Sequence, residues 1–184
     1  MRKVVLTFGI TAGLIVVVLM FLTMPSVLSG DMEAGEAIGY TTMVLALSSI
    51  FFAIKTYRDK YLGGSIKFGK AFVIGLLISL IASFMYSTGW EAYMSINNID
   101  GQEFMESYMD SKVEKMKEVG AAQTEIDAAI EEGKYWMKIM TNPLYRFLFT
   151  MFGEMFWVGL IVSLICAAIL RNKNVLPAKN VAIE

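Results

Sequence analysis

Four long apolar runs constrain the fold of this sequence more than any other feature. Val4–Met24, Ile38–Ile54 and Ala71–Gly89 contain no charged residue, and Phe147–Leu170 contains only Glu154. Because a helix rises about 1.5 Å per residue, roughly 20 residues cross a hydrocarbon core about 30 Å thick. The sequence therefore predicts an all-α, polytopic membrane protein with transmembrane helices over about residues 4–24, 38–54, 69–89 and 147–170.

The composition agrees with lipid as the solvent for these runs. Hydrophobic residues make up 56% of the 184 positions, charged residues make up 18%, and the mean hydropathy is +0.56. An ordinary soluble domain is considerably more polar. The second run is the shortest, and taken alone it could be a buried helix of a soluble protein. Its three neighbours of similar length make that alternative strained, and Ala37, Gly39 and Tyr40 can extend it into the membrane interface.

The first run also resembles a secretory signal peptide. Arg2 and Lys3 form a basic start, and Val27-Leu28-Ser29 is a candidate cleavage site. The apolar core is longer than the roughly 7 to 15 residues of such a region, so we expect an uncleaved first helix. Gly9 and Gly13 support that choice, because their spacing lets two helix backbones approach closely.

Charged residues outside the runs alternate in sign along the chain. The N-terminus, the loop 55–70 and the tail after residue 170 are basic. Segment 26–37 has three acids and no base, and segment 90–146 has eleven acids against six bases. Since short loops rich in Lys and Arg stay on the cytoplasmic side, we expect both termini inside the cell and the acidic segments outside.

The loop 55–70 supplies five candidate headgroup or topology anchors. A cation near anionic headgroups is stabilised by about 1 kcal/mol. A regulatory site for a lipid or a partner is the alternative interpretation, and nothing in the loop requires it. The five cations are Lys55, Arg58, Lys60, Lys67 and Lys70.

The segment between the third and fourth runs is the only sizeable part outside the membrane. Residues 102–119 place apolar side chains three and four apart, which predicts an amphipathic helix that ends at Gly120. Thr124, with Asp127 three positions on, resembles a capping box and opens a second helix, which ends at Asn142-Pro143. We expect an extracytoplasmic helical hairpin over residues 100–142, whose apolar stripes pack on each other, on the membrane or on a partner.

Methionines on the first hairpin helix raise the question of a metal site. Met105, Met109 and Met116 lie on nearly the same face, and thioether clusters can bind copper(I). Methionine is also a common gap-filler, however, and the fourteen in this chain occur in the spans as well. We therefore expect no bound metal and no cofactor.

Small residues recur at every fourth position in the third and fourth spans. Lipid removes the usual hydrophobic drive between helices, so such stripes serve to let helix backbones pack closely. We expect the two helices to meet along these stripes, or one stripe to mediate self-association. The residues are Ala71, Gly75, Ser79, Ser83 and Ser87 in the third span, and Gly159, Ser163 and Ala167 in the fourth.

Glu154, the one acid inside a run, marks a candidate intramembrane polar site. Burying a carboxylate in lipid is costly unless it is protonated, hydrated or paired. One interpretation is a proton or ion relay, which would need a second polar station deeper in the bundle, where only Ser and Thr are available. We favour the other, in which Glu154 lies just inside the interface marked by Trp157 and hydrogen-bonds to Tyr40 or Thr41.

The sequence contains no catalytic motif. It has no histidine, which excludes His-based triads and His metal sites. It has no phosphate-binding loop of the P-loop type, and the lone Cys166 cannot form an internal disulfide. The net charge of -1 argues against a nucleic-acid binder. We therefore do not expect an enzyme.

Several short motifs carry a resemblance to a known family. They include Gly39-Tyr40, Tyr57-Arg58-Asp59-Lys60, Phe68-Gly69-Lys70-Ala71-Phe72 and Asn142-Pro143-Leu144, followed by Glu154. Together they resemble an uncharacterised family of small bacterial integral membrane proteins, catalogued only as a domain of unknown function. The resemblance covers nearly the whole chain. It implies four spans, a variable acidic insert before the last span, and the bacterial cytoplasmic (inner) membrane, but no activity.

Two classes of function remain. The first is a non-enzymatic membrane scaffold or accessory component, which contacts other membrane or envelope proteins or copies of itself in the bilayer. The alternative is a small transporter or channel subunit in which Glu154 responds to an ion or a proton. The spans contain no proline after Pro25 and only one acid, so the broken-helix ion sites of transporters are not indicated. We rank the scaffold first.

Overall fold

The computed structural model of the protein describes residues 1–28 and 32–177, and within them it contains helices and connecting turns but no strand. Four segments are long and apolar enough to span a membrane: Arg2–Pro25, Gly35–Tyr61, Phe68–Ile96 and Pro143–Leu170. The prediction of an all-α protein with four membrane-spanning helices is confirmed. Ser29 of the candidate cleavage site and Asp31 of the acidic segment lie outside the described residues.

Two spans are single helices and two are interrupted. Helix α1 covers Arg2–Leu28 and α4 covers Phe68–Ile96. The second span is divided at Ser48 into α2 and α3, and the fourth contains a π-helical segment, η1, between α7 and α8. The bounds of these parts are Met32–Leu47 for α2, Ser49–Tyr61 for α3, Pro143–Leu148 for α7, Phe149–Met155 for η1 and Phe156–Leu170 for α8.

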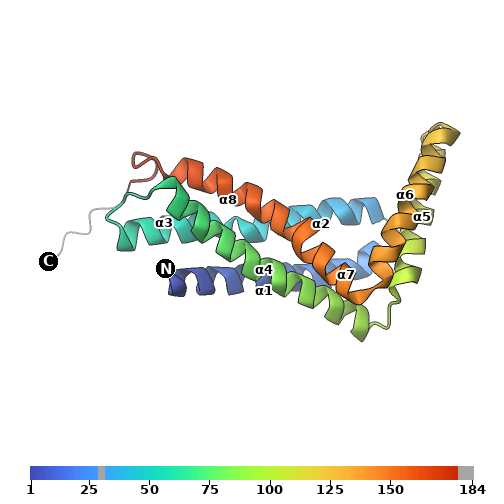
Figure 1. The fold of residues 1–184 in the computed structure, drawn as a ribbon, viewed down its shortest axis with the longest axis horizontal. Helices are drawn as coiled ribbons and strands as arrows, with labels where there is room; N and C mark the ends of the chain where they lie inside the picture. Colours follow the sequence, from blue (N-terminus) through green and yellow to red (C-terminus); the bar gives the residue numbers. More distant parts are fainter. Residues whose placement is uncertain (29–31, 178–184) are drawn as a thin grey trace.

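The four spans form a bundle in which α4 has the central place. It packs most extensively against α1 and α8, and α3 also contacts both α4 and α8. The N-terminus, the loop between α3 and α4 and the chain after α8 all lie at one end, which we call the terminal end (Figure 1). Helices α5 (Gly101–Glu118) and α6 (Gln123–Thr141) project at an angle from the opposite end, the hairpin end.

Small residues bring α4 and α8 into close contact. A Cβ atom added at Gly159 would overlap the Ser79 side chain, and one added at Gly75 would overlap Ser163. The hydroxyls of Ser79 and Ser163 lie 3.3 Å apart, and each also donates to the carbonyl four residues earlier in its own helix. The prediction that the third and fourth spans meet along their small-residue stripes is confirmed.

Helix α1 uses its two glycines in the same way. Gly9 lies against Ile81 of α4, and Gly13 lies against Met85 one turn further along. A larger residue at either position would push the helices apart, because a Cβ there would come within about 3 Å of the facing side chain. The spacing of these glycines therefore marks a packing face within the bundle.

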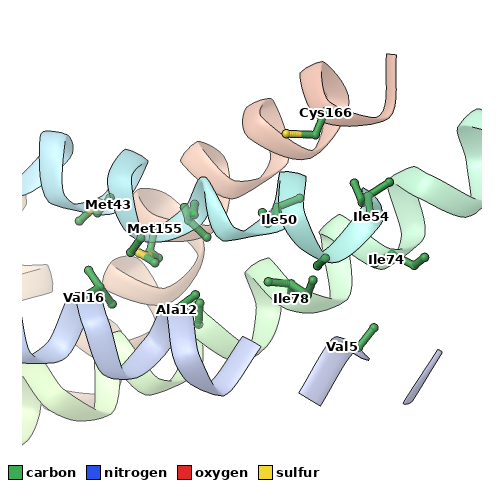
Figure 2. Close-up of a cluster of buried hydrophobic side chains, with 14 of the residues drawn as sticks. Val5, Ala12, Val16, Met43, Ile50, Ile54, Ile74, Ile78, Met155 and Cys166 are labelled. Atoms are coloured by element: carbon green, nitrogen blue, oxygen red, sulfur yellow. The ribbon is translucent and has the colours of Figure 1, made fainter. Parts of the chain in front are cut away.

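The interior of the bundle is mainly apolar, apart from buried hydroxyl side chains such as Ser79 and Ser163. Val5, Ala12 and Val16 of α1 lie near Ile50 and Ile54 of α3 and the isoleucines of α4 (Figure 2). Cys166 belongs to this buried cluster, which agrees with its interpretation as a small apolar residue.

The predicted hairpin is present, with one correction to its second helix. Asp100 caps α5 by accepting hydrogen bonds from the backbone of Gln102 and Glu103, and Gly120 ends the turn with a φ of +73°. The prediction that Thr124 and Asp127 cap α6 is wrong. The cap position lies two residues earlier, at Ala122, so Glu125 stands three residues past it and accepts from the Ala122 amide at 3.1 Å.

Substituting Gly159 tests how much the bundle depends on this close packing. We expect Gly159→Ala to lower the free energy of unfolding by about 1–3 kcal/mol, because the added methyl group overpacks the contact with Ser79. The measurement is thermal unfolding in detergent. Gly69→Ala is the matched control, since a Cβ at Gly69 meets nothing within 4 Å. Equal shifts in both variants would contradict the close contact.

Candidate functional site

A cavity of about 380 Å³ lies at the hairpin end, between the bundle and the α5–α6 hairpin. Segments α1, α2, α4 and η1 form its bundle wall, and α5 and α6 cover it. Two aromatic contacts join the walls. Phe104 of α5 packs edge-on against Trp90 of α4, and Trp136 of α6 lies 4.8 Å from the ring of Phe149 in η1. The cavity is therefore a shared feature of the membrane bundle and the hairpin.

Charged residues in the cavity wall are mainly acidic. Glu36, Glu132 and Glu154 line it, and Lys112 is the single cation among its described lining residues. Glu36 accepts a hydrogen bond from the Tyr108 hydroxyl at 3.3 Å. Glu132 accepts one from the Trp136 indole at 3.2 Å. Two of the three carboxylates thus have aromatic donors from the hairpin.

Tyr108 of α5 stays a hydrogen-bond donor in this setting. Its partial burial, the negative charge of Glu36 and the hydrogen bond to that carboxylate all raise the pKa of Tyr108 above its ordinary value. The phenol is therefore protonated at neutral pH, and it can hold Glu36 toward the hairpin.

Glu154 faces the cavity from the π-helical segment of the fourth span. A π-turn contains more residues than an α-turn and so changes which face of the helix the following side chains occupy; such segments are frequent at functional sites. The predicted hydrogen bonds to Tyr40 and Thr41 are not formed. Tyr40 lines the same cavity, but the exposed Thr41 hydroxyl donates to the carbonyl of Ala37 at 2.7 Å. Among the described residues, Glu154 has no hydrogen-bond partner.

Two polar donors on α4 also line the cavity. The Tyr86 side chain is only 7% exposed. The indole nitrogen of Trp90 is buried and has no hydrogen-bond partner among the residues that the structure describes. Because buried polar groups are normally satisfied, the Trp90 nitrogen and the Glu154 carboxylate are the chemically unfulfilled part of the wall.

A buried ion pair fixes the base of the hairpin next to this cavity. Arg146 of α7 forms two hydrogen bonds with the carboxylate of Glu91 on α4, at 2.8 and 2.6 Å. Its remaining nitrogen donates to the carbonyl of Met140, the penultimate residue of α6, at 2.7 Å. Gly101, at the start of α5, packs directly against Met140 and Arg146. We call this group the hairpin clamp.

The sequence interpretation missed the hairpin clamp, although a signal for it exists. Glu91 follows the third apolar run and Arg146 precedes the fourth. Opposite charges at the same membrane depth on two adjacent spans can pair, and only Arg offers the planar fork that matches a carboxylate.

The five predicted anchors lie at the terminal end, and Arg58 differs from the others. Lys60, Lys67 and Lys70 are exposed, so their contact with headgroups stays a prediction. Lys70 also lies 5.7 Å from the centre of the Tyr57 ring, and Lys55 pairs with Asp59.

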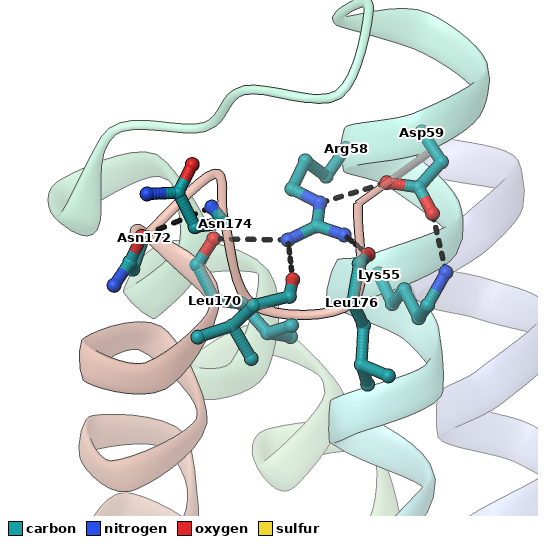
Figure 3. Close-up of polar contacts among 8 residues, drawn as sticks. Lys55, Arg58, Asp59, Leu170, Asn172, Asn174 and Leu176 are labelled. Carbon is teal, nitrogen blue, oxygen red and sulfur yellow. Dashed lines mark hydrogen bonds and ion pairs between the residues drawn. The ribbon is translucent and has the colours of Figure 1, made fainter. Parts of the chain in front are cut away.

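Arg58 is fully buried and makes contacts within the protein rather than with headgroups (Figure 3). It pairs with Asp59 at 2.7 Å and donates to the backbone carbonyls of Leu170, Val175 and Leu176. The carbonyls at the end of a helix have no partner within the helix, and a cation there is favourable. Arg58 therefore holds the end of α8 and the following segment onto α3.

Of the three methionines considered for copper, only two line the cavity. Met105 and Met109 line the cavity, whereas Met116 lies further along α5, outside the lining. Among the described residues, no group of three or more His, Cys, Asp or Glu side chains could hold a metal ion.

Comparison with known proteins identifies one family. Residues 7–172 match the model of a family described as "Protein of unknown function (DUF4199)". No curated protein and no solved structure matches the chain.

A double-mutant cycle on Glu91 and Arg146 tests the hairpin clamp. We expect Glu91→Gln and Arg146→Gln to show a coupling of about 1–3 kcal/mol in the free energy of unfolding, because each single change leaves a charged, partly or fully buried partner unpaired. The pair Glu131 and Lys134 on α6 is the control, since both side chains are mostly exposed and should couple negligibly. A coupling for the clamp no larger than the control would contradict it.

Proposed function

The chain belongs to the DUF4199 family of proteins of unknown function, and from the geometry we propose a non-enzymatic, multi-pass membrane scaffold. In this role it is an accessory component that presents the α5–α6 hairpin to another membrane or envelope protein. The distribution of charge supports an orientation in a bacterial inner membrane with both termini cytoplasmic, because the exposed cations Lys60, Lys67 and Lys70 lie at the terminal end.

The observation that carries this proposal is the fixed mounting of the hairpin. Arg146 joins the end of α4 to the end of α6, and Gly101 brings the start of α5 against the same group. A connecting loop needs no such ion pair, whereas a surface that must meet a partner gains affinity when it is held in one orientation.

The hairpin also offers apolar side chains to a partner. Tyr135 on α6 is 62% exposed, and Val119, at the turn between the helices, is 82% exposed. Aromatic residues such as Tyr are enriched at protein interfaces. The exposure of both side chains agrees with contact to a second protein rather than with packing inside this one.

Photo-crosslinking from the hairpin tests the scaffold proposal. With a photoreactive phenylalanine analogue at Tyr135, we expect a discrete protein adduct in native membranes, because this side chain would lie at the interface. The same analogue at Phe52, an exposed residue of α3 within the membrane span, is the control and should give lipid adducts. An adduct of twice the chain mass would identify a second copy as the partner. Absence of any protein adduct from Tyr135 would count against the proposal.

A transporter or channel subunit is the second candidate, and Glu154 is the observation that favours it. This acid lies within a span, on a π-helical segment, facing a cavity and without a hydrogen-bond partner among the described residues. Against it, Met155, the next residue along the chain, is fully buried in the core, as is Ser83 of α4. The bundle is packed at these positions, which favours a site at one end over a pathway through the bundle.

Flux measurements distinguish the two candidates. For a transporter, the purified protein in liposomes would give pH-dependent flux that Glu154→Gln abolishes and Glu114→Gln, on the exposed face of α5, leaves unchanged. We expect no such flux, because the scaffold proposal requires none. A flux that disappears with Glu154→Gln would overturn our ranking.

A further inference from the structure

We propose that the cavity at the hairpin end is a binding site for a lipophilic organic cation. The inference is independent of the scaffold role, since it rests on the chemistry of the cavity wall and not on what the hairpin contacts. Its volume of about 380 Å³ lies within the range of roughly 300–1,000 Å³ that is usual for small-molecule sites.

The charges of the cavity wall favour a positively charged ligand. Three carboxylates, Glu36, Glu132 and Glu154, face Lys112 as the single cation of the described lining. Glu36 and Glu154 line the same cavity. A carboxylate in a largely apolar setting is costly unless it is paired, and a bound cation would pair with Glu154. An anion would be repelled by the excess of carboxylates in the wall.

The aromatic and thioether groups of the wall select an organic cation over a metal ion. The rings of Tyr40, Tyr86, Trp90 and Trp136 line the cavity together with Met105 and Met109. Ring faces attract organic cations, but they cannot replace the oxygen ligands that hard metal ions require. The same surfaces exclude water from the apolar part of a lipophilic ligand.

The unpartnered Trp90 indole nitrogen is the independent sign that a ligand belongs here. This donor atom is buried, and the residue lines the cavity without a hydrogen-bond partner for that nitrogen among the described residues. Orphaned buried donors are uncommon in native proteins. Trp90 and Glu154 line the same cavity, so a cationic ligand that also carries an acceptor atom can contact both.

The test compares two ions of nearly the same shape and opposite charge, tetraphenylphosphonium and tetraphenylborate. The full chain is placed in nanodiscs of zwitterionic lipid, and tryptophan fluorescence is recorded against empty nanodiscs. Trp90 and Trp136 line the cavity whereas Trp157 does not, so two of the three tryptophans report on the site. We expect saturable quenching by the phosphonium ion and none by the borate.

Variants then locate the binding. Glu154→Gln should weaken phosphonium binding about tenfold, equivalent to the loss of one close ionic contact. Glu114→Gln removes an acid from the exposed face of α5, outside the cavity, and should leave the affinity unchanged. Thermal unfolding checks that both variants fold, and the comparison of the two ions on the unaltered protein needs no variant.

Three outcomes would overturn the proposal. Equal saturable binding of both ions would show an apolar cavity without charge selection. Absence of saturable phosphonium binding would show that the cavity does not take such a ligand. An equal loss of affinity in Glu154→Gln and Glu114→Gln would assign the effect to general surface charge.

Discussion

The close approach of α4 to its neighbours is the contact on which the remaining architecture depends. Lipid is as apolar as a leucine side chain, so these helices associate through short-range packing rather than through escape from water. Gly13 lets α1 approach Met85 of α4, and Gly159 lets α8 approach Ser79 of α4. With both neighbours held, α4 carries Tyr86 and Trp90 to the cavity wall and Glu91 to the hairpin clamp.

Arginine fixes a segment of chain at each end of this bundle. At the terminal end Arg58 binds the last carbonyl of α8 and two carbonyls of the segment after it, and at the hairpin end Arg146 binds Glu91 and the carbonyl of Met140. Each guanidinium is almost completely buried and uses several of its donors. Lysine could supply the charge but not the planar set of donors, which is why the cations of loop 55–70 have unequal roles although they look alike in sequence.

The features that the sequence predicts are those set by local pattern. Run length predicts the four spans, and four-residue spacing predicts the small-residue faces along which α4 and α8 meet, because both follow from the regular geometry of a helix. The clamp joins Glu91 to Arg146, which lie 55 positions apart, and burial of Arg58 requires the chain after α8 to fold back. The cavity could not be predicted for the same reason, because six segments form its walls. The π-helical segment that places Glu154 at the cavity also has no characteristic residue pattern. That Glu36 lines the same cavity as Glu154 could not be predicted either, because Glu36 lies before the predicted second span.

A ligand in the cavity and a partner on the hairpin would be linked through shared walls. Tyr86 and Glu154 belong to the bundle, whereas Tyr108 and Trp136 belong to the hairpin. A ligand that contacts both sets favours the conformation in which the hairpin lies close to the bundle. The free energy by which it can shift the hairpin equals the difference in its binding free energy for the close and the open conformations. Because Arg146 holds the base, any such shift is a change of tilt about the clamp, with the largest displacement near Val119. The hairpin would thus rotate about the clamp that attaches it to the bundle, and binding in the cavity would change the position of the surface that the proposed partner contacts.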